Sequence, residues 1–274
     1  MEVPRVREKY QQTLELCRAN NDKIGEARVL FQLGVLELEE GNLVESRCRF
    51  EESGNVFNGL GHPSSDQINA EISYRLGTID LWEGKYSEAR PRFEQWLIRM
   101  RAAQNLSSEA SVVGILGKID YAEKRYGSAR VRVSEALSIQ THLRNDIERV
   151  RLLSTLSSID VAEGHDGDAA KSLAAGVKIA RDIRSPLVEM EIFEEVALFA
   201  WKRGHRRIAI LLLGICKSFE GDVGSANRDR IAKGFSQMAQ TLQLSESSVE
   251  DVILQSRQEY RNDRAARLVE QALQ

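Results

Sequence analysis

Residues 72–93 read ISYRLGTIDLWEGKYSEARPRF, and residues 112–133 read VVGILGKIDYAEKRYGSARVRV. Each stretch places a glycine inside an apolar helical pattern, a turn seven residues later, and a small residue at the opening of a second helical pattern. The pattern predicts two antiparallel helices joined by a tight turn. Because the same arrangement returns at a fixed distance, we expect a chain built from helical hairpins.

The hairpin pattern occurs five times. The small residue within the first helix recurs at spacings of about 43, 40, 40 and 40 residues, the scale of helical repeat arrays. This residue is Gly34, Gly77, Gly117, Ser157 and Ala197, and the turn residue is Gly41, Gly84, Lys124, Gly164 and Gly204. The second helix opens on Ser46, Ala89, Ala129, Ala169 and Ala209 and carries a large apolar anchor at Phe50, Phe93, Val133, Leu173 and Leu213. The agreement of these columns predicts a repeat protein.

The order of leucine, glycine, turn glycine, alanine and phenylalanine resembles the tetratricopeptide (TPR) pattern. This resemblance implies an all-α fold, a TPR-like α-α superhelix or solenoid of about five helix-turn-helix repeats with a helical C-terminal cap. The repeats are longer than the usual TPR unit, and the column where TPRs favour tyrosine holds Glu37, Asp80, Asp120, Asp160 and Ala200. Both departures are similar to the C-terminal TPR region of bacterial LuxR/MalT-type transcriptional regulators and related signal-transduction ATPases.

The register divides the chain into three parts. Residues 25–219 form the five repeats, and residues 220–274 form capping helices over 228–242, 245–260 and 264–273, which we expect to cover the apolar helix around residues 208–213. The rival interpretation makes this tail a separate partner-binding module. Residues 1–24 match the second helix of a repeat, because Tyr10 precedes Gly34 as Phe93 precedes Gly117. They are either part of an incomplete repeat, with Met1 at a fragment boundary, or an N-terminal cap.

Three local features qualify the helix pattern. The stretch from Asn58 to Pro63 predicts a turn-rich linker that ends the preceding helix. Pro91 lies near the start of its helix, where a missing backbone donor is tolerated. An aspartate, Asp166 or Asp168, is expected to cap the helix that follows the turn at Gly164.

Composition predicts a cytoplasmic protein without a membrane partner. The net charge of −3 gives no strong basic field for nucleic acid or an anionic membrane. Three scattered cysteines without a CxxC spacing indicate reduced thiols. The sequence shows neither a signal peptide nor an apolar run of about 18 residues. We therefore expect no direct nucleic acid contact from this region.

The chemistry-bearing residues predict no enzyme, no cofactor and no metal site. No histidine pair has metal-ligand spacing, and no nucleophile motif is present. His165 and His205 share a turn position in adjacent repeats, with Asp166 and Asp168 nearby. That grouping suits a metal ion, but solvated loop histidines are the more common explanation.

The TPR resemblance implies a binding groove lined by the first helix of each pair. Carrying the family's inward positions over to this chain selects Arg28, Phe31, Tyr74, Leu81, Lys118, Tyr121, Arg151, Glu194 and Trp201 as candidate contacts. Aromatic anchors among polar groups suit a protein or peptide partner, or a small-molecule inducer. The alternative for each residue is packing between repeats. The expected function is the interaction or sensing region of a bacterial signalling regulator, and the alternative is a free-standing TPR adaptor.

A second set of residues predicts ion pairs. Glu37 and Arg47, Asp80 and Arg90, and Asp120 and Arg130 each lie ten residues apart across a hairpin. The hypothesis is a partly buried pair between the two helices of one hairpin, which sets register more than it adds stability. Alanine and isoleucine replace both partners in repeat five, while repeat four keeps Asp160 but has Ala170.

Overall fold

The computed structural model describes residues 3–60, 65–218, 225–261 and 265–274, which form fourteen α-helices and no strand. The predicted all-α class is confirmed. The helices are α1 (Val3–Ala19), α2 (Lys23–Glu39), α3 (Leu43–Leu60), α4 (Ser65–Trp82), α5 (Tyr86–Ala102), α6 (Leu106–Ala122), α7 (Tyr126–His142), α8 (Asp146–Glu163), α9 (Asp166–Ile183), α10 (Pro186–Lys202), α11 (Arg206–Ser218), α12 (Ser225–Thr241), α13 (Glu246–Arg261) and α14 (Ala265–Leu273).

Five hairpins pair α2 with α3, α4 with α5, α6 with α7, α8 with α9, and α10 with α11. Their turns contain the predicted turn residues, all in the left-handed region with φ between 62° and 86°. Glycine reaches this region without steric cost, and Lys124 is the residue that does so with a side chain. The turn column of the sequence is therefore confirmed in all five copies.

The small residue within each first helix is buried, as the pattern predicts. A Cβ built on Gly34 would lie 2.9 Å from the Phe50 ring, and one on Gly117 would lie 2.7 Å from Cγ2 of Val133. Those two neighbours are the large anchors of the second helices, and both are fully buried. The missing side chain thus lets the anchor of one helix reach the backbone of its partner.

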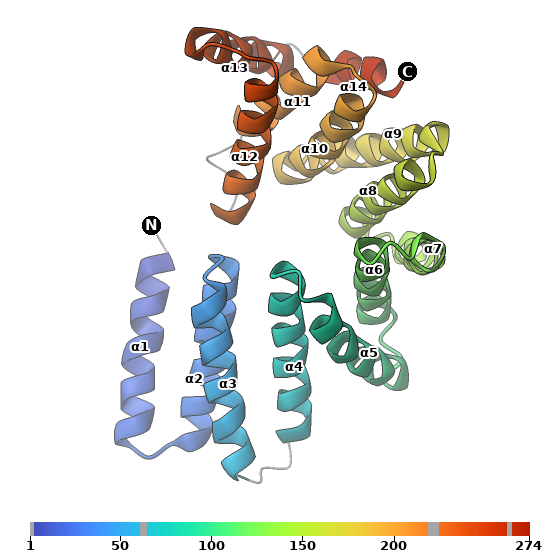
Figure 1. Cartoon of the computed structure of the whole chain (residues 1–274). Helices are drawn as coiled ribbons and strands as arrows, with labels where there is room; N and C mark the ends of the chain where they lie inside the picture. Colours follow the sequence, from blue (N-terminus) through green and yellow to red (C-terminus); the bar gives the residue numbers. More distant parts are fainter. Residues whose placement is uncertain (1–2, 61–64, 219–224, 262–264) are drawn as a thin grey trace. The chain divides into compact units, whose positions relative to one another are not determined.

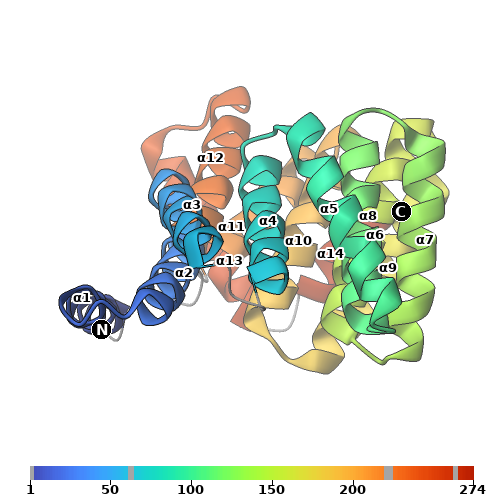
Figure 2. The same cartoon turned by 90° about the horizontal axis from the view of Figure 1, so that it is seen from below.

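Unit 1, residues 1–105, is one of two compact parts of the chain. Its helices α1 to α4 stand side by side in Figure 1, and Figure 2 shows α1 end-on but α4 tilted, so the helix axes turn along the array. One buried cluster contains Phe50, Ile72 and Ile79. Another joins Leu14 of α1 to Leu30 and Leu33 of α2. Successive helices therefore bury each other's apolar faces, as expected for an array.

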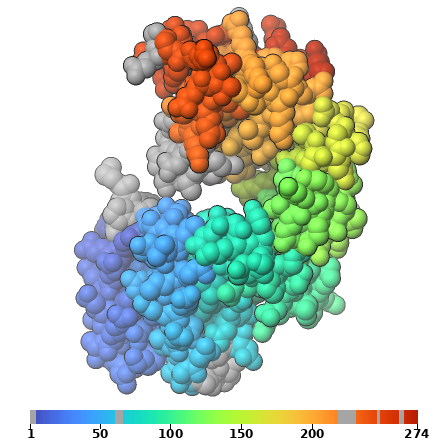
Figure 3. All heavy atoms as spheres, in the orientation of Figure 1, coloured from blue at the N-terminus to red at the C-terminus, as the bar shows by residue number. Residues whose placement is uncertain are grey.

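Unit 2, residues 106–274, carries the last three hairpins and the tail. A single large cluster extends from Val150 through α9, α10 and α11 into α12 and α14. Helices α12, α13 and α14 all pack on the apolar α11, so the predicted cover by the tail is confirmed. Figure 3 shows the atoms of these tail helices, in orange to red, lying directly against those of α10 and α11. None of the helices in the described ranges is long and apolar enough to cross a membrane.

Two local predictions are wrong and one is confirmed. Helix α3 continues through Asn58 to Leu60, because the helix tolerates asparagine and glycine on its exposed end, while residues 61–63 of the predicted linker lie outside the described residues. No aspartate caps α9: the cap position falls on His165, directly after the turn glycine, so that Asp166 is already the first helical residue. Pro91 lies within the continuous helix α5, as expected.

The ion pairs join different partners from those predicted. Arg47 pairs with Asp80 of the following hairpin at 2.8 Å, and Arg130 pairs with Asp160 of the following hairpin at 2.6 Å. Arg7 of α1 occupies the same column and pairs with Glu37 at 3.0 Å. The arginine on each of these second helices therefore fastens its repeat to the next one, and the pairing of Glu37 with Arg47 within one hairpin is corrected. We call this contact the arginine lock.

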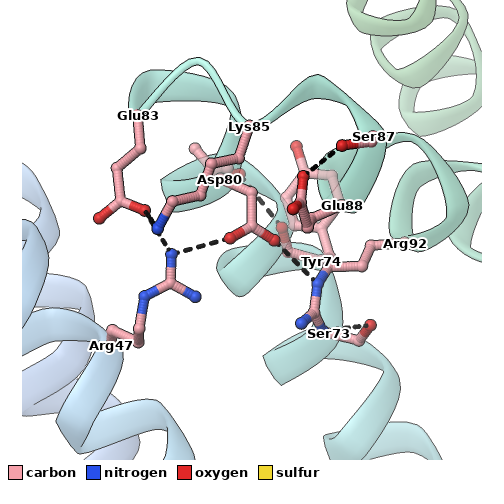
Figure 4. A network of polar contacts seen from close by, with 10 residues as sticks. Arg47, Ser73, Tyr74, Asp80, Glu83, Lys85, Ser87, Glu88 and Arg92 are labelled. Carbon is pink, nitrogen blue, oxygen red and sulfur yellow. Dashed lines mark hydrogen bonds and ion pairs between the residues drawn. The ribbon is translucent and has the colours of Figure 1, made fainter.

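The lock around Asp80 is drawn in Figure 4. Arg47 reaches across from α3 to Asp80 and to Glu83, with both contacts at 2.8 Å. Arg92 donates from Nε to the other oxygen of Asp80 at 3.0 Å, in place of the predicted Arg90. Asp120 is likewise held by Arg125 at 2.7 Å and by Arg132 at 3.3 Å. The carboxylates of Asp80 and Asp120 are almost fully buried, and the neighbouring guanidinium groups offset the free-energy cost of burying their negative charge.

Candidate functional site

The nine residues proposed for a groove lie in both units. Arg28 and Phe31 are on α2, and Tyr74 and Leu81 are on α4 of unit 1. Phe31 packs edge-on against Phe50 with ring centroids 5.3 Å apart. Tyr74 contacts the Phe93 ring at 5.5 Å and the Trp96 ring at 5.1 Å. Both rings thus serve the packing within unit 1, while Arg28 is exposed.

The candidates of unit 2 converge from three first helices. Lys118 and Tyr121 come from α6, and Arg151 comes from α8. Arg151 donates to both oxygens of Glu191 on α10, at 3.0 and 3.2 Å, and to Glu148 at 2.8 Å. Helix α8 contacts α6 and α10, which brings these side chains onto one surface. We define the inner face as Lys118, Tyr121, Glu148, Arg151, Glu191 and Glu195, the groups that act on one another across α6, α8 and α10.

Lys118 is exposed, and charged side chains of α8 and α10 lie near its ammonium group. Loss of hydration among the neighbouring helices lowers the pKa of Lys118. The nearby carboxylates of Glu148, Glu191 and Glu195 act in the opposite direction, and Arg151 adds to the lowering. Lys118 therefore loses its proton more readily than a lysine whose pKa has the ordinary value.

Tyr121 lies partly buried beside Lys118 on the next turn of α6. Desolvation raises the pKa of the Tyr121 hydroxyl, the nearby Tyr126 and Glu195 raise it further, and a hydrogen bond with Ser158 of α8 opposes the rise. Its ring stands 5.8 Å from that of Tyr126. The side chain therefore offers a ring edge and a neutral hydroxyl at the inner face.

The two remaining candidates, Glu194 and Trp201, lie on α10. Glu194 is buried, with 7% of its surface exposed. Trp201 is partly buried against the large cluster, and the guanidinium of Arg206 lies 4.1 Å from its ring centroid. Leu198, on the turn between them, is 41% exposed. The inner face therefore combines an acidic excess with apolar and aromatic groups.

A group of potential metal ligands differs from the one considered in the sequence. Asp160, Glu163 and His165 approach one another closely, whereas Asp166 pairs with Arg203 at 3.2 Å and Asp168 with Lys171 at 2.8 Å. Arg130 contacts both Asp160 and Glu163, so a guanidinium already supplies the positive charge there. The cluster is therefore part of an arginine lock.

Lys118 provides a test of the inner face by titration. Its folded-state pKa lies below the ordinary value of 10.5, so the protonated lysine destabilises the fold at neutral pH, and this penalty declines as pH rises from the folded pKa to 10.5. We expect the NMR signal of ¹³C-methylated Lys118 to titrate at lower pH than that of Lys171, whose pKa Asp168 raises. Glu148→Gln should lower the Lys118 midpoint further. A Lys118 midpoint at or above that of Lys171 would contradict this geometry.

The repeated hairpins, the left-handed turns and the small-residue contacts define a TPR-like helical repeat fold. Solved structures share it. The apo form of RapI aligns with a TM-score of 0.58 and 13% identity, over 95% of this chain and 71% of that one. The Rap conjugation gene regulator of plasmid pLS20 in complex with the Phr* peptide aligns with a TM-score of 0.58 and 14% identity, over 96% and 74%.

A third neighbour carries the repeat type in its description. The nearly identical TPR-like repeats of a putative kinesin light chain from Podosopora anserina align with a TM-score of 0.50 and 19% identity, over 70% of this chain and 94% of that one. No protein-family model and no curated protein matches the sequence. At these identities the likeness establishes the fold.

Proposed function

We propose that the inner face of unit 2 binds a peptide or an extended segment of a partner protein. The observation that carries the proposal is the convergence of Lys118, Tyr121 and Arg151 with Glu191 and Glu195 from three consecutive first helices. First helices supply one side chain each per turn, so a ligand that runs across them meets a regular series of polar and aromatic groups.

The chemistry of the inner face favours a ligand with positive charge. Glu148, Glu191 and Glu195 outnumber Lys118 and Arg151, and Leu198 adds an exposed apolar contact. A lysine or arginine of the ligand would pair with these carboxylates, while its aliphatic stem would lie on Leu198 or Tyr121. The pLS20 regulator, a structural neighbour, is described in complex with a peptide, which supports this class of ligand.

The test is a displayed library of random peptides selected on the full chain. We expect enriched peptides with basic residues, and we expect Tyr121→Ala and Glu191→Gln each to weaken their binding about tenfold, the effect of losing one good contact of about 1.4 kcal/mol. Binding should also weaken with salt, because exposed charges are screened.

Tyr86→Ala is the matched control, since Tyr86 is a partly buried tyrosine at the start of α5, outside the inner face. Circular dichroism should show the same helical content for both tyrosine variants. Enrichment of no peptide, or a loss of binding by Tyr121→Ala that merely follows a loss of folding, would contradict the proposal.

A second proposal concerns the kind of protein in which this binding takes place. We infer the ligand-sensing region of a bacterial regulator of the LuxR/MalT type, acting in the cytoplasm, from the acidic column and the long repeats. The free-standing adaptor has equal support from the fold. A protein or peptide fits the inner face better than a small inducer, because its groups come from three separate helices. Co-expression with an adjoining ATPase module, followed by assay of ligand-dependent ATP hydrolysis, separates the regulator from the adaptor.

A further inference from the structure

A cleft of about 560 Å³ opens in unit 1 over α4; the second helix α3 lines it on one side, and Arg92 is the lining residue that comes from the next second helix, α5. Its apolar lining consists of Phe50, Ile72 and Leu76. The carboxamides of Asn55, Asn58 and Asn69 and the carboxylate of Glu51 give it a polar rim. At 100° per residue, Ile72 and Leu76 lie on the side of α4 opposite Tyr74, so this α3–α5 cleft faces away from the first-helix surface that carries the predicted groove residues.

Unit 2 contains the equivalent position on the repeat register. Helix α9 corresponds to α3 at an offset of 123 residues, as Ser157 corresponds to Gly34, and α10 corresponds to α4 at an offset of 120, as Ala197 corresponds to Gly77. The cleft residues Phe50, Gly54 and Asn58 therefore match Leu173, Val177 and Arg181.

In unit 2 this position is filled by the chain's own helix α14. Helix α14 packs on α9, α10 and α11, the counterparts of α3, α4 and α5. Val177 and Arg181 lie along the seam between α9 and α14, together with Ala174 and Lys178, the counterparts of Glu51 and Asn55. The fold thus shows what fits between two second helices: a single short helix.

The way α14 is seated defines that fit. Ala265, Leu268, Val269 and Ala272 form a narrow buried stripe, while Arg267, Glu270 and Gln271 remain exposed. Small residues in the stripe let the helix approach closely. The hydrogen bond from Tyr260 at the end of α13 to Glu189, at 3.2 Å, lies at the position that corresponds to Asn69 on the cleft rim.

We propose that the α3–α5 cleft binds a short amphipathic helix of a partner protein. Its stripe of alanine, leucine and valine residues would cover Phe50, Ile72 and Leu76, and Gly54 leaves room where repeat four has Val177. The rim favours hydrogen-bonding flanks with at most one basic residue, because it carries three carboxamides and the exposed carboxylate of Glu51, while Arg92 is already engaged by Asp80 at 3.0 Å. Binding here should therefore depend less on salt than binding at the inner face, where several charged groups lie together.

The probe is a fluorescent peptide with the sequence of residues 265–274, AARLVEQALQ, in which exposed positions 267 and 271 become a lysine and a glutamate joined by a lactam. The lactam holds a helix that is otherwise too short to be stable in water. We expect anisotropy to detect its binding to the full chain. Gly54→Trp should weaken binding at least tenfold by filling the cleft, and circular dichroism should show that the variant keeps its helical content, because the Cβ itself makes an ordinary contact of 3.6 Å with Ile72.

Gly59→Trp is the matched control, since it adds the same ring to the same helix where nothing lies within 4 Å. It should leave binding unchanged, as should Tyr121→Ala, which makes this test independent of the inner face. Absence of binding would overturn the proposal, and so would binding insensitive to Gly54→Trp, because the peptide would then be replacing α14 in unit 2. Self-association of the chain that Gly54→Trp abolishes would assign the cleft to a second copy instead.

Discussion

Gly117→Leu is expected to lower the free energy of unfolding by about 3 kcal/mol, near the upper end for overpacked cores. Even the first atom of a new side chain would lie 2.7 Å from Val133 Cγ2 and 3.4 Å from the carbonyl oxygen of Ala129. Neither neighbour has free space, because Val133 and Ala129 are fully buried. Helices α6 and α7 would have to separate, and urea unfolding followed by circular dichroism measures the cost.

Gly127→Leu provides the matched comparison. Gly127 lies on the exposed side of α7 with nothing within 4 Å of its Cβ position. The same substitution should there be neutral or stabilise by up to about 1 kcal/mol, because leucine favours the helix more than glycine does. Equal effects of the two substitutions would show that glycine acts through helix propensity alone and would remove the packing argument.

The second large effect concerns the arginine lock. Arg130→Ala should destabilise by about 2 kcal/mol, between the values of exposed and fully buried ion pairs, because it leaves Asp160 buried beside Glu163 without its cation. Asp160 is only 1% exposed, so water cannot replace the guanidinium fully. Thermal unfolding monitored by circular dichroism gives the measurement.

The chain contains its own neutral version of this contact. The positions of Arg130 and Asp160 correspond to Ala170 and Ala200 one repeat later; Ala200 is buried in the large core of unit 2, and Ala170 is partly buried against it. The double variant Arg130→Ala/Asp160→Ala should therefore recover most of the lost stability. A double variant as unstable as the sum of its single variants would show that the two residues do not act as a pair.

The repeat columns were sufficient to predict the hairpins, because each column reflects a local constraint. Gly41 must adopt a positive φ, and Gly34 must admit Phe50 at 2.9 Å. Such requirements are met by residue type within one hairpin, so they are visible in sequence. The inner-face residues Lys118, Tyr121 and Arg151 could be selected from the same register because first helices repeat at fixed positions.

The partners of the ion pairs could not be selected from distance along one hairpin. A separation of ten residues between Asp120 and Arg130 and a separation of thirty between Arg130 and Asp160 both recur in the sequence. Ala170 and Ala200 distinguish the two separations. They replace the arginine and the aspartate together, and they are thirty residues apart. Arg7 fits only the longer separation, as the partner of Glu37.

The α3–α5 cleft was also beyond sequence reasoning. Its floor residues Ile72 and Leu76 follow the ordinary pattern of a core helix, and the carboxamides of Asn55 and Asn58 read as ordinary surface positions. Whether a neighbouring segment fills such a space depends on tertiary packing, as it does for α14 over α9, α10 and α11. Only the comparison of the two positions in three dimensions distinguishes an open one from a filled one.

The placement of the arginine locks predicts the order in which the helices unfold in salt. Contacts made by Arg7 and Arg47 weaken in concentrated salt, whereas the junction at Ala170 and Ala200 has no charge to screen. Under such conditions the amides of α1 to α3 should exchange with deuterium first and those of α9 to α11 last, so the protein would fray from its N-terminal end inward.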